Sequence, residues 1–119
     1  MPRYALVIRH REPNWDSVPR DRQKEIIAGY YRWTDDLRAS GQYVDSVPLA
    51  DGGRTLRSAA VEPTDGPFTE TKEIVGGFVL VETPDIAAAV DAARGCPALL
   101  IGDRIDVRPV AEHARPEGA

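Results

Sequence analysis

A short cluster of ionisable side chains in the middle of the chain is the part of the sequence best equipped for chemistry. The segment TDGPFTETKE, residues 64–73, contains Asp65, Lys72 and Glu73. A carboxylate can act as a general base, and a lysine ammonium can contact an anion. Asp65 and Glu73 are therefore the candidate catalytic residues, although the sequence defines no reaction for them.

Ligand binding is a second role for this segment. The residues predicted to contact a ligand are Tyr4, Asp65, Phe68, Lys72 and Glu73. On a strand, neighbouring residues point to opposite faces, so Lys72 and Glu73 cannot form one catalytic pair. An enzyme would need Asp65 or Glu73 desolvated beside a donor, for which the sequence offers Lys72, Arg57 and Tyr4.

A purely structural interpretation of the segment is also complete, and we favour it. Asp65 can accept hydrogen bonds from backbone amides further along, and Gly66 permits a positive φ. Pro67 fixes the next φ, and burial of Phe68 would anchor the turn. Thr69 and Thr71 are then ordinary exposed loop residues.

Histidine and cysteine offer little further chemistry. His10 ends a predicted strand and could serve as a general base there, but we favour a surface position. His113 lies in a predicted tail, and Cys96 has no histidine nearby in sequence, so we interpret it as a packing residue. These residues show no metal-ligand spacing, and no glycine-rich loop opens a helix, so we predict neither a metal nor a cofactor.

Four aromatic residues could line a pocket. Tyr30 and Trp33 belong to a regular apolar stripe with Ile26 and Leu37, at the spacing of one helix face. Their predicted place is the core. Trp15 and Tyr31 lie outside that stripe and are freer to contact a ligand.

The composition is that of one globular domain. The chain has 119 residues, of which 42% are hydrophobic and 29% charged, with a net charge of −4. Scattered arginines and a negative net charge argue against direct nucleic-acid binding. No segment has the length of a membrane helix or the pattern of a signal peptide, and the single cysteine suits a reducing compartment. We expect a cytoplasmic protein.

The elements that would position these side chains follow from periodicity and from end signals. Two helices are expected, one over residues 19–40 capped by Asp16 or Ser17 and closed by Gly41, and one opened by Thr83 as the cap. The second helix should bury Ile86, Val90 and Ala93. The predicted strands span residues 4–9, 43–49, 55–61, 76–82 and 104–110.

This order, with one extra strand or hairpin arm set aside, is βαββαβ. It predicts an α+β, ferredoxin-like protomer, in which an antiparallel sheet carries two helices on one face. Strands that are apolar on both sides imply that the second face is covered as well, most simply by another copy of the protein. We expect one domain over residues 1–111, a tail over residues 112–119, and a homodimer packed sheet to sheet.

The sequence DGPFTETKEIVGGFVLVETPDIAAAVDAA, residues 65–93, resembles the DGPF-domain branch of the YCII-related family, which is YciI-like. Weaker similarity extends to the strands YALVIR and IDVRPV. The resemblance implies a dimeric α+β barrel and a functional link to an extracytoplasmic-function sigma factor. A His and Asp pair is the suspected catalytic device of a related YciI-like branch, and no such pair is evident here.

Two functions remain open. The first is a small-molecule-binding or regulatory homodimer without enzymatic activity. The alternative is a cofactor-independent lyase or isomerase that uses an acidic residue near the DGPF turn. Fold alone does not decide between them.

Overall fold

Four antiparallel strands form the main sheet, in the order β2-β5-β1-β6. The computed structural model describes residues 1–11, 15, 17–50, 52–66 and 73–112. The two central strands, β5 and β1, carry apolar residues on both faces, as strands with both faces covered do. The strands are β1 (Arg3–Arg11), β2 (Tyr43–Pro48), β5 (Glu73–Glu82) and β6 (Arg104–Pro109).

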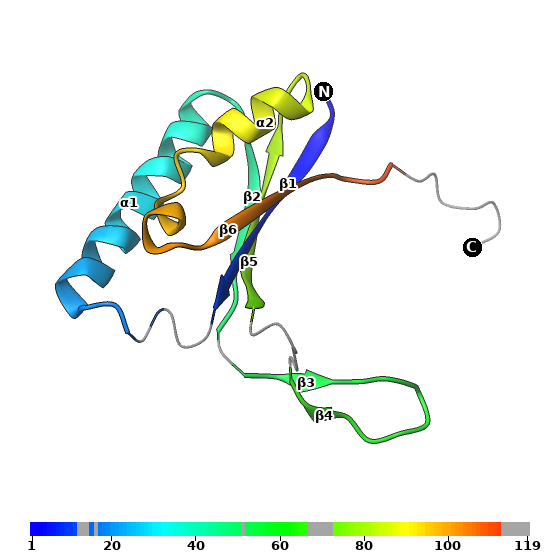
Figure 1. Ribbon diagram of the computed structural model, residues 1–119. Coiled ribbons are helices and arrows are strands. Elements are labelled where there is room, and N and C mark those ends of the chain that lie inside the picture. The colour runs from blue at the N-terminus through cyan, green and yellow to red at the C-terminus, as the bar shows by residue number, and fades with distance from the viewer. Residues whose placement is uncertain (12–14, 16, 51, 67–72, 113–119) are drawn as a thin grey trace.

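Both helices cover the same face of this sheet (Figure 1). They are α1 (Arg20–Ala39) and α2 (Ile86–Ala93), and a short 3₁₀ turn, η1 (Pro97–Ile101), connects α2 to β6. The four strands and two helices occur along the chain as βαββαβ, which confirms the predicted α+β, ferredoxin-like fold. The turn η1 was not predicted from the sequence.

A small hairpin projects from the sheet, away from the helices (Figure 1). It pairs β3 (Arg54–Thr55) with β4 (Thr64–Asp65) in a separate two-stranded sheet. The predicted strand over residues 55–61 is therefore wrong beyond Thr55. Its apolar residues do not pack, since Leu56 is 63% and Val61 54% exposed.

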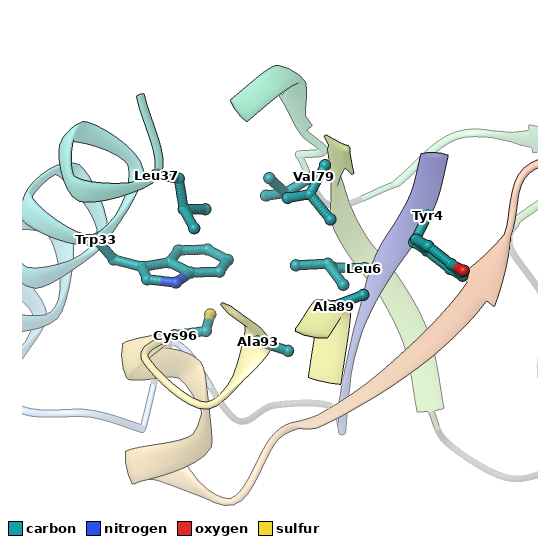
Figure 2. Close-up of a cluster of buried hydrophobic side chains, with 9 residues drawn as sticks. Tyr4, Leu6, Trp33, Leu37, Val79, Ala89, Ala93 and Cys96 are labelled. Carbon is teal, nitrogen blue, oxygen red and sulfur yellow. The ribbon is translucent and has the colours of Figure 1, made fainter. Parts of the chain in front are cut away.

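The core lies between the sheet and the helices (Figure 2). Alternation along the strands turns Leu6 of β1 and Val79 of β5 to this side, where they are paired in register and fully buried. The predicted stripe of α1 is confirmed, because Ile26, Trp33 and Leu37 are buried. The rest of the core cluster is made of Tyr4, Val81, Ala89, Ala93 and Cys96.

The start of α1 differs from the prediction. Its N-cap is Pro19, which makes no side-chain hydrogen bond, so the cap is not Ser17. Asp16 lies outside the described residues. The end agrees with the prediction, because Gly41 has a φ of 77° and Gln42 donates to the Leu37 carbonyl over 2.9 Å.

The cap of α2 is Asp85, not Thr83. The Asp85 carboxylate accepts from the amide of Ala88 over 2.9 Å. The Thr83 hydroxyl is buried and donates to the Asp85 carbonyl over 2.8 Å, so it holds the loop that presents the cap.

The buried side of α2 was partly mispredicted. Ala89 and Ala93 face the core, whereas Ile86 is 47% exposed. The small side chains lie innermost because the helix lies close to the sheet, where a larger side chain would hold it off.

Candidate functional site

A pocket of about 510 Å³ opens between α1 and the ends of β1, β2 and β5. We call it the His10 pocket. Its lining is mainly apolar and aromatic, with a few polar groups, which is the usual composition of a small-molecule site. The described lining residues are His10, Trp15, Ile26, Ile27, Tyr30, Tyr31, Pro48, Leu49, Ala50, Gly76, Ile101 and Asp103.

A β-bulge in β5 makes room for the His10 side chain. The pairing of β1 with β5 shifts between Ile8 and Arg9, so that Ile8 lies opposite Gly77 and Arg9 opposite Val75. Gly76 is the extra residue, and a Cβ on it would overlap the His10 ring. The imidazole therefore lies directly over the Gly76 backbone.

Gly77 allows β2 to approach β5 closely on the side away from β1. Its φ is 154°, and a Cβ on it would come within 2.7 Å of the Val47 carbonyl oxygen. The Leu49 amide donates to the Gly76 carbonyl over 2.9 Å, which fixes the pocket wall formed by Leu49 and Pro48. Two adjacent glycines thus shape one side of the pocket.

The aromatic wall comes from α1. The rings of Tyr30 and Tyr31 meet edge to face, with centroids 6.1 Å apart and planes at 84°. Tyr30 also packs edge to face on Trp33 at 5.7 Å. Burial raises the pKa of the Tyr30 phenol, and a hydrogen bond with Ser46 of β2 opposes this in part. Tyr30 is thus fixed, while Tyr31 is 62% exposed.

The loop before α1 adds Trp15. The Trp15 carbonyl accepts from the Gln23 side-chain amide over 2.9 Å and from the Val18 amide over 3.0 Å. The Gln23 bond ties this residue to the first turn of α1, and the Val18 bond closes the turn that precedes the helix, so Trp15 lines the pocket from a fixed backbone. The prediction that Trp15 and Tyr31 are free of the core is consistent with this position.

Asp103, which precedes β6, also lines the pocket. It is 9% exposed, and its backbone amide donates to the Ala98 carbonyl over 3.2 Å after the left-handed Gly102. Burial, together with the negative charge of Asp103, raises the pKa of the neighbouring Cys96 thiol to about 11. Cys96 is therefore a buried thiol, as predicted, and not a nucleophile at neutral pH.

The predicted site residues whose side chains the structure describes do not line this pocket. Asp65 is 95% exposed and pairs with Arg54 over 3.0 Å in the hairpin. Tyr4 is a core residue, 8% exposed, and Arg57 is exposed. The backbone of Glu73 begins β5, and Phe68 and Lys72, with Thr69 and Thr71, lie outside the described residues. The described candidates therefore provide no desolvated carboxylate beside a donor.

The structure instead brings together two residues that were not paired in the sequence analysis. His10 and Asp103 come from opposite ends of the chain and line one pocket, because β1 lies beside β6 in the sheet. His10 was predicted to be a surface residue, and Asp103 was not singled out at all. His113 lies outside the described residues.

A comparison with protein families decides the family. The model of the YCII-related domain matches residues 3–113. The chain belongs to the YCII-related family. No curated protein matches the sequence.

Two further properties concern the described part of this YCII-related chain only. None of its helices has both the length and the apolar character needed to cross a membrane. Within the same residues, no group of three or more His, Cys, Asp or Glu side chains could hold a metal ion.

Proposed function

We propose that this YCII-related protein is a homodimer that binds a small organic molecule in the His10 pocket. One observation carries the proposal: an apolar and aromatic pocket of about 510 Å³ contains a histidine that the fold holds in place through a bulge. Such a pocket, with few polar groups, is the default site of a small molecule.

Thermal-shift screening against a metabolite library tests this proposal. A ligand at 100 times its Kd stabilises the folded state by about 2.7 kcal/mol, which raises the melting temperature. Tyr31→Ala should abolish the shift without unfolding the protein, because the ring is largely exposed. Leu100→Ala is the matched control, since Leu100 is 68% exposed and lies outside the pocket.

The turn residues form a second location to be tested in the same screen. Asp65→Asn and Lys72→Ala should leave the shift intact if the ligand occupies the His10 pocket. A shift that these two substitutions abolish, and that Tyr31→Ala leaves unchanged, would place the ligand at the turn. A library that produces no shift at all would count against a binding protein.

The dimer is supported by the uncovered face of the sheet, by which we mean the face that neither α1 nor α2 covers (Figure 1). Alternation turns Ala5, Val7, Phe78 and Leu80 away from the helices, and Val47 pairs with Phe78 on the same side. A contiguous apolar face of this kind is typical of a contact between subunits. A regulatory role alongside an extracytoplasmic-function sigma factor rests on the family resemblance alone.

A cofactor-independent enzyme is the second candidate function, and one observation favours it. His10 and Asp103 line the same pocket, so an imidazole base and a carboxylate border one ligand site. Asp65, by contrast, is solvated and paired with Arg54. Turnover of a ligand found by screening, lost in His10→Gln while binding persists, would support the enzyme over the binding protein.

A further inference from the structure

We infer that the hairpin, residues 52–66, packs against the second copy of the chain in the homodimer, so that each subunit holds the other with one hairpin. This inference rests on the dimer of the proposed function and adds a segment of the chain to its interface. Three observations carry it: the direction in which the hairpin projects, its weak support within its own chain, and the exposed apolar side chains that lead onto it.

The hairpin projects on the side of the sheet that carries the uncovered face. Both helices lie on the other side, and the hairpin leaves the sheet in the direction away from them (Figure 1). It follows β2 and leads back into β5, which are neighbouring strands of that sheet. A second copy that stacks on the uncovered face therefore lies beside the hairpin.

The hairpin has little support from its own chain. Each of its strands has only two residues. All hydrogen bonds and ion pairs that residues 52–66 make with described residues join one part of the hairpin to another. The ion pair of Arg54 with Asp65 is solvated, so it contributes little to stability. Since a two-stranded hairpin by itself is marginally stable at best in water, this hairpin needs a further surface to pack on.

Exposed apolar side chains continue from the uncovered face onto the hairpin. Val47 of β2 and Val75 of β5 are exposed on that face, where Val75 pairs with Arg9. Leu56 and Val61 are exposed in the loop between β3 and β4. Single exposed apolar residues are ordinary on a monomer, whereas a set that extends from a sheet face onto a projecting loop is typical of a subunit interface.

Two-fold symmetry doubles the contribution of the hairpin. In a symmetric dimer the same surface of both subunits takes part, so every contact of one hairpin occurs twice. The dimer would then bury two copies each of Leu56 and Val61. Removal of these side chains should therefore weaken the association of the subunits strongly.

Isotope-filtered NMR tests the contact directly. Mixed dimers of full-length subunits, one with ¹³C-labelled leucine and valine methyl groups and one unlabelled, report contacts between subunits only. The methyl groups of Leu56 and Val61 should show nuclear Overhauser effects to protons of the unlabelled subunit. Leu100 is the internal control, because it is similarly exposed but lies on η1, on the side of the helices, and it should show none.

Sedimentation over a dilution series measures what the contact contributes. The double variant Leu56→Ser, Val61→Ser should raise the dissociation constant of the dimer about tenfold or more. Its circular dichroism should remain that of the wild type, because neither residue belongs to the core cluster. Leu100→Ser should leave the dissociation constant unchanged.

Two results would overturn the inference while the wild type is dimeric. One is a mixed dimer in which neither Leu56 nor Val61 contacts the unlabelled subunit, and the other is a double variant with the dissociation constant of the wild type. Both would leave the dimer and the His10 pocket standing, because the mass of the wild type and the library screen with Tyr31→Ala decide these separately. A monomeric wild type would refute the dimer and the role of the hairpin together.

Discussion

The His10 ring occupies the space that a side chain on Gly76 would fill, so the two residues fit only as a pair. The bulge places Gly76 under the ring, and the next residue, Gly77, lets β2 approach. This relationship links the stability of the sheet to the shape of the pocket.

Gly76→Ala should displace the His10 ring. Overpacking of this kind costs about 1–3 kcal/mol of unfolding free energy, measured by chemical denaturation. Any ligand of the His10 pocket should also bind more weakly. Gly29→Ala is the control: its Cβ would meet Pro97 at an ordinary 3.4 Å, and alanine within α1 should stabilise by about 0.5–1 kcal/mol. Equal effects of the two substitutions would refute the steric argument.

Asp85→Ala should destabilise the protein by about 1 kcal/mol, because it removes the acceptor for the Ala88 amide at the start of α2. Asp85→Ser should recover most of this loss. Asp91→Ala is the matched control, because Asp91 is exposed and forms a surface ion pair with Arg94, the C-cap residue of the same helix. Thermal unfolding followed by circular dichroism compares the three variants, and a loss for Asp91→Ala as large as that for Asp85→Ala would contradict the assignment of the cap.

Stability should fall as the pH rises from about 9 to about 11. Burial raises the pKa of Cys96 from 9.0 to about 11, so in this window the unfolded chain loses a proton that the folded protein keeps. The unfolded state is thereby favoured, by roughly 2–3 kcal/mol at the upper end. Tyr30, whose pKa is also raised by burial, acts in the same direction at higher pH.

Denaturation of the wild type and of Cys96→Ala over this pH range isolates the thiol. The variant should lose the part of the slope that begins near pH 9 and keep the part due to tyrosine. An identical pH profile for both proteins would show that the thiol is not responsible.

Leu80→Asp should dissociate the proposed dimer, because it places a charge in the middle of the uncovered sheet face. Light scattering should give the wild type twice the mass of a 13.0 kDa chain, and the variant the mass of one chain. Leu100→Asp, on an exposed part of η1, should leave the wild-type mass unchanged. A wild-type mass near 13.0 kDa at micromolar concentration would refute the dimer.

Much of the fold is predictable from local patterns in the sequence. The stripe of Ile26, Trp33 and Leu37 identified the buried side of α1, and Gly41 marked its end. The alternation in β6 also placed Ile105 and Val107 on the core side and Arg104, Asp106 and Arg108 on the other. These features depend on neighbouring residues only.

The candidate site was not predictable in the same way. His10 acquires its place from a bulge in β5, and Asp103 joins it only because β6 pairs with β1. A glycine pair in a strand is the one local signal of such a bulge, and the pattern of residues 76–82 by itself predicts a regular strand. Leu56 and Val61 had the opposite effect, because their apolar side chains predict a strand. In the structure both are exposed in the loop between β3 and β4.

The projecting hairpin also divides the polypeptide into two halves of equal design. The part before it contributes β1, α1 and β2, and the part after it contributes β5, α2 and β6. In the sheet, however, the strands of the two halves alternate, in the order β2-β5-β1-β6. Each half therefore contains no two strands that pair with each other in this sheet. A cut in the exposed loop between β3 and β4 would therefore yield two fragments that can only fold around each other, which makes this loop a natural split point for a complementation reporter.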